Sequence, residues 1–438
     1  MSDGYLRVEQ SFGLKGEIEL VGAKNAVLVI MASLLLASGK SVLHNVPASA
    51  DVFETIELLH HIGAEVFFDT HNHRLEVDTS VINGWTLSPS MMKKTRASFL
   101  FMGPLLARFG KVSIGFPGGD AIGARPLDFH FKNFVKMGVT LDHEDNFVCA
   151  EVDQLVGSRL VLEYPSVGAT ENILMAATRA RGATQIINAA LEPEVMDLIA
   201  VLRKMGADII VQAPACIIIH GVDQLVPIEH EIIYDRLEAG SLLIATAAMG
   251  GEINLAQASV DHLDQLLLKL EQMGHGITVG ENGKGVCFKA TTSPHAVSFK
   301  TGPFPQFPTD LQAPMMALQC FAAGVSVVEE TVFENRFHHV PELIKMGASI
   351  RIEHNKAFIT GVDQLHGAHV TASDIRASTA LVIAGLAAQG TTIISGVHHW
   401  KRGYEALEKK LTQLGAKISV HETHDIVPKN YPSTQLTP

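Results

Sequence analysis

Several basic residues stand where strongly apolar helices are expected to begin. Lys24 opens one such helix in GAKNAVLVIMASLLLASG, and Arg96 and Arg376 hold the same place before RASFLFMGPLLARFG and RASTALVIAGLAAQG. A helix N-terminus carries positive partial charge and free N–H groups, so a cation there is unfavourable by about 0.3–1 kcal/mol. Three such cations at equivalent places indicate an external anion that uses the helix dipole and the cation together.

A local carboxylate is the alternative explanation for each cation. Asp374 lies two residues before Arg376 and leaves that alternative open, whereas no acid is adjacent to Lys24 or Arg96. Arginine suits bidentate contact with phosphate or carboxylate. On a chain of net charge −12, these cations predict a cleft for a multiply anionic ligand. Three further arginines in turn-like contexts belong to the same set: Arg125, Arg336 and Arg402.

Two acids stand in segments rich in proline or glycine. Asp310 lies in PFPQFPTDLQAP, where it or Thr309 would cap a helix, or Asp310 would act as a general base toward a hydroxyl. Asp120 lies in PGGDAIGARP, which is either a turn-rich connector or a mobile loop that closes on a ligand. The remaining polar residues at the predicted helix starts are Asn25, Thr170, Glu171 and Glu238.

Other conspicuous motifs do not predict a metal or a nucleotide cofactor. The histidine groups at 71–73, 338–339 and 398–399 lack a helical i,i+4 pair with a nearby acid, so we expect surface or capping histidines. PGGDAIG matches neither a P-loop nor a dinucleotide fingerprint, and the chain has no GxSxG elbow. We therefore expect no metal and no cofactor.

Internal repeats predict the elements that position these residues. Six amphipathic helices each end at a glycine that precedes a short strand, as in LRKMGADIIV, and glycine is the expected left-handed cap. Six strongly apolar helices alternate with them, and each also ends at glycine. The amphipathic set ends at Gly63, Gly138, Gly206, Gly274, Gly347 and Gly415, and the apolar set ends at Gly39, Gly110, Gly182, Gly250, Gly324 and Gly390.

A helix that is apolar all round must be covered on every side. The repeats therefore predict an α/β fold with buried helices inside and sheets plus amphipathic helices outside, in two domains of three units. We expect one domain over residues 23–234, with a mobile loop at 116–126, and another over 1–22 plus 235–421. Residues 1–22 resemble a strand hairpin that completes the second domain, and 422–438 resemble a disordered tail. Pro104 and Pro314 should kink or shorten their helices.

Composition narrows the class of protein. A chain that is 47% hydrophobic, 18% charged and 6% aromatic is typical of an ordered α/β protein, and its negative charge disfavours binding to nucleic acid or anionic membrane. Widely spaced cysteines in apolar surroundings predict buried thiols in a reducing compartment. The N-terminus lacks a secretory pattern, and apolar runs stop near 12 residues, so we expect a cytoplasmic protein.

The motifs together resemble those of the UDP-N-acetylglucosamine enolpyruvyl transferase (1-carboxyvinyltransferase) family. The resemblance covers residues 22–405 and implies two inside-out α/β domains of three repeats each, joined by a double crossover. It rests on GAKNA, RAS…GPLLARFG, PGGDAIGARPLDFH, PSVGATEN, EPEV, FPTDLQAP, FENRF…HVPELIKMGA, DIRAS and RGYE, which occur in one order.

The resemblance implies transfer of the enolpyruvyl group of phosphoenolpyruvate to the 3-hydroxyl of UDP-N-acetylglucosamine, by addition and elimination without a metal. This is the first committed step of peptidoglycan synthesis. Lys24, Asn25, Arg125 and Arg402 would hold phosphoenolpyruvate, and Asp310 would take the hydroxyl proton. The implied contacts of the UDP-sugar are Arg96, Arg125, Pro126, Leu127, Asp128, Phe129, Tyr164, Pro165, Ser166, Val167, Asp310 and Val332, with Arg336, Asp374 and Arg376 completing the cleft.

Two positions depart from the family pattern. Tyr164 stands where the family commonly has lysine, and Asp120 stands where it most often has the cysteine of the closing loop, a proton donor or a residue needed for product release. A carboxyl can donate a proton if a closed, dry loop raises its pKa. The aspartate predicts resistance to fosfomycin, which alkylates the thiol. The alternatives are a 3-phosphoshikimate enolpyruvyl transferase, a non-catalytic UDP-sugar-binding paralogue, and a DNA clamp, which the apolar inner helices disfavour.

Overall fold

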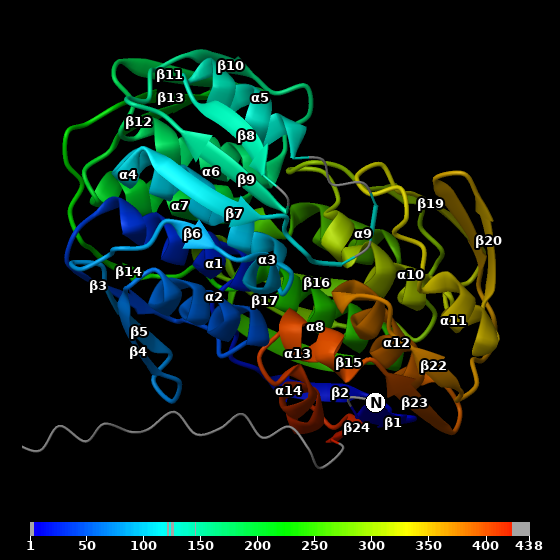
Figure 1. Ribbon diagram of the computed structural model, residues 1–438. Coiled ribbons are helices and arrows are strands. Elements are labelled where there is room, and N and C mark those ends of the chain that lie inside the picture. The colour runs from blue at the N-terminus through cyan, green and yellow to red at the C-terminus, as the bar shows by residue number, and fades with distance from the viewer. Residues whose placement is uncertain (1–3, 121, 124–126, 145, 423–438) are drawn as a thin grey trace, which may run out of the picture.

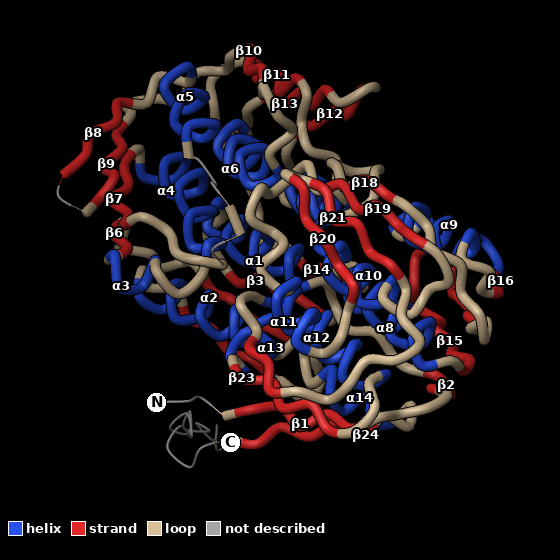
Figure 2. Tube along the Cα trace, turned by 90° about the vertical axis from the view of Figure 1, so that its right-hand side faces the viewer, coloured by secondary structure: helices blue, strands red, loops and turns tan. Residues whose placement is uncertain are grey.

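The computed structural model describes residues 4–422 except 121, 124–126 and 145, and the chain forms two lobes (Figure 1). The described residues build six four-stranded sheets, three in each lobe. Figure 2 shows helices gathered between the sheets, as the repeats predict. The predicted α/β architecture, with buried helices inside and sheets outside, is therefore confirmed. The predicted tail at 423–438 lies outside the described residues.

The first lobe contains three units built on one plan. In the first unit, α1 (Lys24–Ser33), η1 (Leu34–Leu36) and α2 (Ala50–His61) accompany β3 (Lys40–His44), β4 (Glu65–Asp69), β5 (Arg74–Asp78) and β14 (Glu229–Glu231). The second has β6 (Thr86–Leu87), α3 (Pro89–Met92), η2 (Arg96–Phe101), α4 (Met102–Phe109), β7 (Lys111–Gly115), α5 (Asp128–Lys136), β8 (Thr140–Glu144) and β9 (Phe147–Glu151). The third has β10 (Arg159–Val161), α6 (Val167–Ala177), β11 (Ala183–Ile187), α7 (Pro193–Lys204), β12 (Asp208–Gln212) and β13 (Cys216–His220).

The second lobe repeats the plan and takes up the N-terminal strands. Its first unit has α8 (Arg236–Met249), β15 (Gly251–Ser259), η3 (Val260–His262), α9 (Asp264–Gln272), β16 (Gly276–Val279), η4 (Glu281–Gly283), β17 (Lys284–Lys289) and β2 (Leu14–Glu17). Its second unit has β18 (Phe299–Lys300), η5 (Thr309–Leu311), α10 (Gln312–Gln319), β19 (Val325–Glu329), α11 (Val340–Lys345), β20 (Ser349–Glu353) and β21 (Lys356–Thr360). Its third unit has β22 (His369–Thr371), α12 (Ile375–Ala387), β23 (Thr391–Ser395), α13 (Val397–Gly403), α14 (Leu407–Gln413), β24 (Lys417–His421) and β1 (Tyr5–Glu9).

Strand order follows one scheme in each sheet. In β14-β3-β5-β4, for example, β14 lies parallel to β3, whereas β5 runs antiparallel to both β3 and β4.

All twelve glycines that end the repeats have positive φ, between 69° and 128°. A side chain would be strained in that backbone conformation, which is why glycine recurs at these places.

The N-terminal strands do not form the expected hairpin. β1 inserts between β23 and β24, and β2 pairs in parallel with β15 of another sheet. Both edges of β1 are therefore filled by strands from the far end of the chain, and Figure 1 shows its blue ribbon beside the red and orange C-terminal strands. The prediction that residues 1–22 complete the C-terminal half is right, but the pairing within them is wrong.

The two helices that contain proline are the shortest of the inner helices. α4 and α10 have 8 residues each, and each follows a 3₁₀ turn. Pro104 and Pro314 lie in the first turn, where the missing N–H needs no acceptor. Both helices are thus shortened as expected, because each α-helix begins only two residues before its proline.

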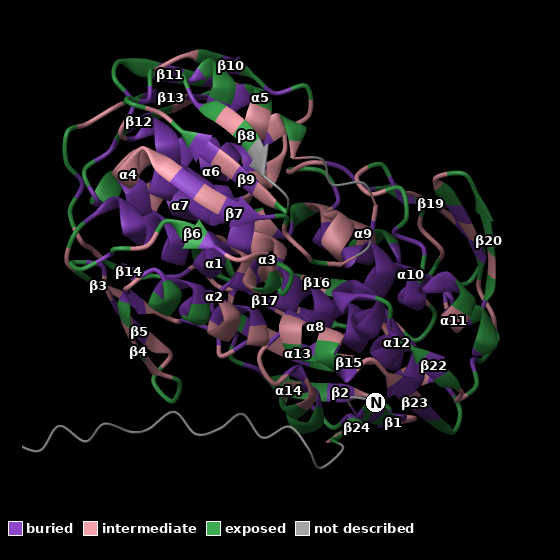
Figure 3. Ribbon diagram, in the orientation of Figure 1, coloured by how far each residue is buried: buried purple, intermediate pink, exposed green. Residues whose placement is uncertain are grey.

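Two separate hydrophobic clusters fill the lobes. One uses buried residues between Ala23 and Ile232, and the other uses Leu6–Leu20 together with Leu237–Ala416. In the second cluster, α8, α10 and α12 pack against one another, and Figure 3 shows the inner helices buried and the outer strands exposed on one side. We propose that each cluster is the core of one domain, with the boundaries expected from the repeats.

Two antiparallel segments connect the lobes. The amide of Ala23 donates to the carbonyl of Ile233 at 2.7 Å, and the amide of Asp235 donates to the carbonyl of Val21 at 2.9 Å. Both crossings thus lie side by side and share hydrogen bonds. Among the described helices, none is long and apolar enough to cross a membrane.

The thiols differ from the expectation that all are buried. Cys320 is buried, whereas Cys149, Cys216 and Cys287 are only partly buried, and all four are free. The three lie in β9, β13 and β17, where they alternate with buried neighbours. Successive side chains of a strand point to opposite faces of the sheet, so buried apolar neighbours in the sequence do not imply that the cysteine between them is buried. These three cysteines lie on the less buried face.

Candidate functional site

A cavity of about 580 Å³ lies between the lobes. The first residues of all six inner helical segments line it, so these six segments converge on one place with their positive ends. The sequence-predicted residues that line it are Lys24, Asn25, Arg96, Asp120, Leu127, Phe129, Tyr164, Pro165, Ser166, Val167, Asp310, Val332, Arg336, Arg376 and Arg402. The cavity is large enough for a nucleotide-sized ligand.

Two predicted residues, Asp128 and Asp374, are placed differently from the prediction. Asp128 is exposed and does not line the cavity, because it begins α5 on the outer side. Asp374 is buried as the N-cap of α12, where its carboxylate accepts from the amides of Arg376 and Ala377, both at 2.9 Å. Its role is therefore to cap the helix rather than to line the cavity. Arg125 and Pro126 lie outside the described residues.

Lys24 and Arg402 come from different lobes and share one carboxylate. Lys24 Nζ lies 3.0 Å from Asp51 Oδ2, and Arg402 Nε lies 2.9 Å from Asp51 Oδ1. Burial raises the pKa of Asp51, but the charges of Lys24 and Arg402 outweigh it and leave the pKa below its usual value. Asp51 was not expected at the site, because an acid at the start of α2 has the pattern of an ordinary helix cap.

Asp120 adds a further member to this group. Its Oδ1 lies 2.9 Å from Arg402 Nη1 and 3.6 Å from His399 Nδ1, and its Oδ2 accepts from the amide of Ile375 at 3.4 Å. Burial raises its pKa, but the interactions with His399 and Arg402 outweigh that effect and hold the pKa well below the usual range. The 3.6 Å distance is long for a hydrogen bond, so Arg402 is the firmer partner. The carboxylate is thus ionised in this arrangement, contrary to the raised pKa that donation of a proton would need.

Asp310 is held by two arginines instead of capping a helix. Its oxygens lie 2.6 Å from Arg336 Nη2 and 2.8 Å from Arg376 Nη2. Burial raises the pKa of Asp310, but the two guanidinium charges outweigh it and hold the pKa far below its usual range. Arg376 also donates to the hydroxyl of Tyr404 at 2.7 Å. Arg376 therefore does not pair its side chain with Asp374, the alternative left open by the sequence.

Acidic residues that the sequence did not single out as a site line another part of the cavity. Glu192 and Glu194 follow β11, and Arg236 binds both carboxylate oxygens of Glu194 at 2.9 and 3.1 Å. Burial raises the pKa of Glu171 well above its usual value, and the charges of Glu194 and Glu192 add to the shift. Burial, together with the charges of Glu192 and Glu330, raises the pKa of Tyr164 to about 12. Glu171 and Tyr164 are therefore neutral hydrogen-bonding groups near neutral pH.

His130 forms part of the cavity wall. It is 6% exposed, and its Nδ1 lies 3.2 Å from Asn172 Nδ2. Burial, with the nearby charge of Arg96, lowers the pKa of His130 to about 3, so the ring is neutral. His130 ends the motif PGGDAIGARPLDFH but was not predicted as a site residue, because it lies inside an amphipathic helix.

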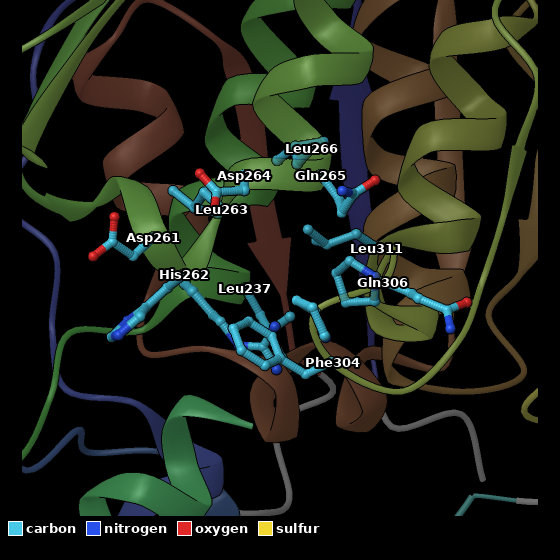
Figure 4. A pocket seen from close by; sticks show the side chains of 13 residues that line it. Leu237, Asp261, His262, Leu263, Asp264, Gln265, Leu266, Phe304, Gln306 and Leu311 are labelled. Atoms are coloured by element: carbon cyan, nitrogen blue, oxygen red, sulfur yellow. The ribbon is translucent and has the colours of Figure 1, made fainter. Parts of the chain in front are cut away.

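A second hollow lies beside the cavity, around Arg236 and Phe304. Figure 4 shows that Leu237, Leu266 and Leu311 crowd it, and its volume is about 10 Å³. That space holds about one water molecule, so it is no ligand site. Among the described residues, no group of three or more histidine, cysteine or acidic side chains is arranged to hold a metal ion.

Comparison with known proteins identifies relatives over nearly the whole chain. The family model of EPSP synthase (3-phosphoshikimate 1-carboxyvinyltransferase) matches residues 8–411. UDP-N-acetylglucosamine 1-carboxyvinyltransferase 1 of Caldanaerobacter subterraneus is 47% identical over 94% of this chain and 98% of the relative. The UDP-N-acetylglucosamine 1-carboxyvinyltransferase of Thermodesulfovibrio yellowstonii is 46% identical over 92% of this chain and 96% of the relative.

Solved structures show the same fold. The enolpyruvyl transferase NikO from Streptomyces tendae superposes with a TM-score of 0.87 at 24% identity, covering 97% of this chain and 100% of that one. EPSP synthase from Acinetobacter baumannii gives a TM-score of 0.74 at 17% identity, covering 95% and 99%. These likenesses extend to the arrangement of both lobes.

Proposed function

The chain belongs to the EPSP synthase family and, within it, to the UDP-N-acetylglucosamine 1-carboxyvinyltransferases, and from that premise we propose the reaction that its cavity performs. It transfers the enolpyruvyl group of phosphoenolpyruvate to the 3-hydroxyl of UDP-N-acetylglucosamine and releases phosphate. The product enters peptidoglycan synthesis. One observation carries the proposal: the starts of six inner helical segments and the basic residues Lys24, Arg96, Arg336, Arg376 and Arg402 line one cavity between the lobes.

Both substrates are polyanions, and the cavity offers matching groups. Lys24 and Arg402, held in place by Asp51, supply cations for the carboxylate and phosphate of phosphoenolpyruvate. Tyr164, Ser166 and Val167 at the start of α6 supply hydrogen-bond donors for the diphosphate of the sugar nucleotide. Tyr164 offers a neutral hydroxyl at a position where a cation would bind the diphosphate more strongly.

We assign to Asp310 the removal of the proton from the 3-hydroxyl. Its side chain is 26% exposed, so part of it can meet a substrate in the cavity. While Arg336 and Arg376 hold both oxygens, the low pKa makes the carboxylate a weak base. A substrate phosphate near Arg336 would draw that guanidinium away and return basicity to Asp310.

The addition step joins the sugar oxygen to C2 of phosphoenolpyruvate while C3 gains a proton from Asp120. In the elimination step Asp120 takes a proton back from C3, the bond from C2 to the phosphate oxygen breaks, and the double bond is restored. The phosphate leaves with the hydroxyl proton, which Asp310 passes to it. Lys24 and Arg402 would stabilise the negative charge on the phosphate as that bond breaks.

The test is release of inorganic phosphate from phosphoenolpyruvate in the presence of UDP-N-acetylglucosamine. We expect release only when both substrates are present, and an enolpyruvyl sugar nucleotide of matching mass. The exposed substitution Asp223→Asn serves as a control that leaves the rate unchanged. No release, with both ligands bound, would instead identify a non-catalytic binding protein.

The matching family model gives a second candidate, transfer to 3-phosphoshikimate. The same assay with 3-phosphoshikimate as acceptor distinguishes the two reactions. We expect no phosphate release with that acceptor, because relatives 46–47% identical carry the name of the UDP-sugar enzyme. Release with 3-phosphoshikimate alone would reverse the assignment.

A further inference from the structure

The Asp120 carboxylate is bound by donors from the opposite lobe. Arg402 Nη1 of α13 lies 2.9 Å from Oδ1, and the amide of Ile375 at the start of α12 donates to Oδ2 at 3.4 Å. Asp120 lies two residues after Gly118, whose amide donates to the carbonyl of Met92 in the first lobe at 2.9 Å. The contact therefore joins the two lobes across the cavity.

These donors have the chemistry of an anion site. A guanidinium and a free amide in the first turn of a 13-residue helix both favour a carboxylate or phosphate oxygen. Asp120 is such an anion and is 12% exposed at its side chain. The protein thus supplies its own occupant for the donors that an anionic substrate would need.

The charges of this group already balance. Lys24 and Arg402 carry two positive charges, and Asp51 and Asp120 carry two negative charges. Asp51 is 2% exposed and holds both cations, so it is a fixed part of the site. Asp120 is more exposed, lies in a glycine-rich segment and contacts only one of the two cations, which makes it the exchangeable partner.

We propose that Asp120 is an internal competitor of the anionic co-substrate, whose carboxylate or phosphate must displace it from Arg402 and the start of α12 in order to bind. The identification of that co-substrate as phosphoenolpyruvate rests on the proposed function. The competitor limits affinity for phosphoenolpyruvate in a way that a neutral side chain at this position would not.

Displacement also changes the protonation of the carboxyl. The charged and titratable groups that contact Asp120 among the described residues are Arg402 and His399 from α13, and Asp374 is the chain neighbour of Ile375 at the start of α12. Asp51 and Lys24 lie behind Arg402. Once Asp120 leaves Arg402 and lies beside a bound anion, it loses its cation and gains a like charge, so it takes up a proton from solvent. Displacement thereby prepares the acid that the addition step requires.

Calorimetric titration of phosphoenolpyruvate tests the proposal without turnover. The protein is saturated with a 3-deoxy analogue of UDP-N-acetylglucosamine, which cannot accept the enolpyruvyl group. We expect Asp120→Asn and Asp120→Ala to bind phosphoenolpyruvate at least about tenfold more tightly than the wild type, equivalent to about 1.4 kcal/mol. Asp223→Asn is the matched control and should not change the affinity. Unchanged or weaker binding by both Asp120 variants would overturn the proposal.

A double-mutant cycle assigns the effect to Arg402. In an Arg402→Gln background, affinity is weaker and Asp120→Asn should change it less than about twofold. An undiminished effect would show that Asp120 acts by general repulsion and would overturn displacement from Arg402. Circular dichroism of each variant verifies that it is folded.

Proton uptake is the second measurement. Titrations of the wild type at pH 8 in buffers of different ionisation enthalpy should show more protons taken up per phosphoenolpyruvate than titrations of Asp120→Asn. Equal uptake would contradict protonation of Asp120 on displacement. Failure of the proposed function gives a different result, namely a wild type that releases no phosphate with natural substrates.

Discussion

Three aspartates at the cavity are held by arginines, and their exposure separates their roles. The exposed fraction of the side chain rises from 2% in Asp51 to 12% in Asp120 and 26% in Asp310. Asp51 lines the cavity but is the most buried of the three, and both of its oxygens are held by Lys24 and Arg402, which it orients. Asp120 and Asp310 are more exposed to the cavity, so they are the two candidates for proton transfer.

The carboxylate at position 120 predicts resistance to fosfomycin. Alkylation by the epoxide needs a thiolate, and a carboxylate paired with Arg402 is a far poorer nucleophile. We expect the wild type to retain activity over a period in which Asp120→Cys is inactivated completely. Asp120→Ala is the control for structural change and should not be modified. A covalent adduct on Asp120 in intact-protein mass spectrometry would contradict the prediction.

Replacement of Asp310 by asparagine should abolish most turnover. The amide cannot accept the hydroxyl proton, and general base catalysis contributes about 10²- to 10⁴-fold to a rate. The substitution also leaves Arg336 and Arg376 without their counter-ion, and each of these side chains is about 5% exposed or less. We expect this loss to lower the unfolding free energy by about 3 kcal/mol. Steady-state kinetics and urea unfolding measure the two effects. A kcat within tenfold of the wild type would exclude Asp310 as the base, and the exposed Asp363→Asn is the control.

The sequence allowed prediction of the site residues that belong to recognisable local motifs. It did not allow prediction of their partners, which lie far away along the chain. Lys24 and Asp51 are 27 residues apart, and Glu194 and Arg236 are 42 apart, so neither pair is visible as a motif. Charge could be read from the residue types, but protonation could not. Asp120 was expected to have a raised pKa on burial, and the structure places Arg402 beside it with the opposite effect.

At the scale of elements, the N-terminal ends of the inner helices form the candidate site, and their C-terminal ends contain the glycines that recur in every repeat. The starts line the cavity, and glycines with positive φ turn the chain back toward the sheets at the ends. These features were predictable because periodic apolar residues and glycine are local signals. The pairing of β1 with β23 and β24 was not, since its partners lie nearly 400 residues away and a hairpin satisfies the same local pattern.

The cap of α12 offers a test of how an element positions a side chain. Asp374→Ala removes the acceptor for two first-turn amides and should lower the unfolding free energy by about 0.5–2 kcal/mol. Because Arg376 belongs to that turn, the apparent KM for UDP-N-acetylglucosamine should rise several-fold. Asp374→Asn keeps an equally good cap and is the matched control. Equal stability of the alanine and asparagine variants would show that the cap does not hold the helix start.

At the scale of the whole molecule, one buried carboxyl lies where the chain first crosses between the lobes, at residues 21–23. Glu238 at the start of α8 accepts from the amide of Val21 at 3.1 Å and from Lys410 Nζ at 2.7 Å. It therefore connects the first crossing, the second lobe and helix α14. No local pattern predicts this contact, because Val21 and Glu238 are 217 residues apart.

Glu238 should make the joint between the lobes sensitive to pH. Burial raises its pKa to about 7, and the charge of Lys410, which acts in the opposite direction, only partly offsets the effect. Between the unfolded value of 4.5 and about 7, the folded state binds the proton that the unfolded state has lost. The contribution of Glu238 to the unfolding free energy is therefore present at low pH and falls as pH rises through this window, by on the order of 3 kcal/mol.

Comparison of the wild type with Glu238→Gln isolates this contribution, because glutamine stays neutral at every pH. Urea unfolding should find the variant gaining stability relative to the wild type as pH rises from 5 to 8, while the exposed Glu281→Gln follows the wild type throughout. Lys410→Met removes the charge that lowers the pKa, so its loss of stability should extend to higher pH. If the difference between wild type and Glu238→Gln is constant, or changes in the opposite direction, the pair with Lys410 outweighs burial and Glu238 is ionised in the folded protein.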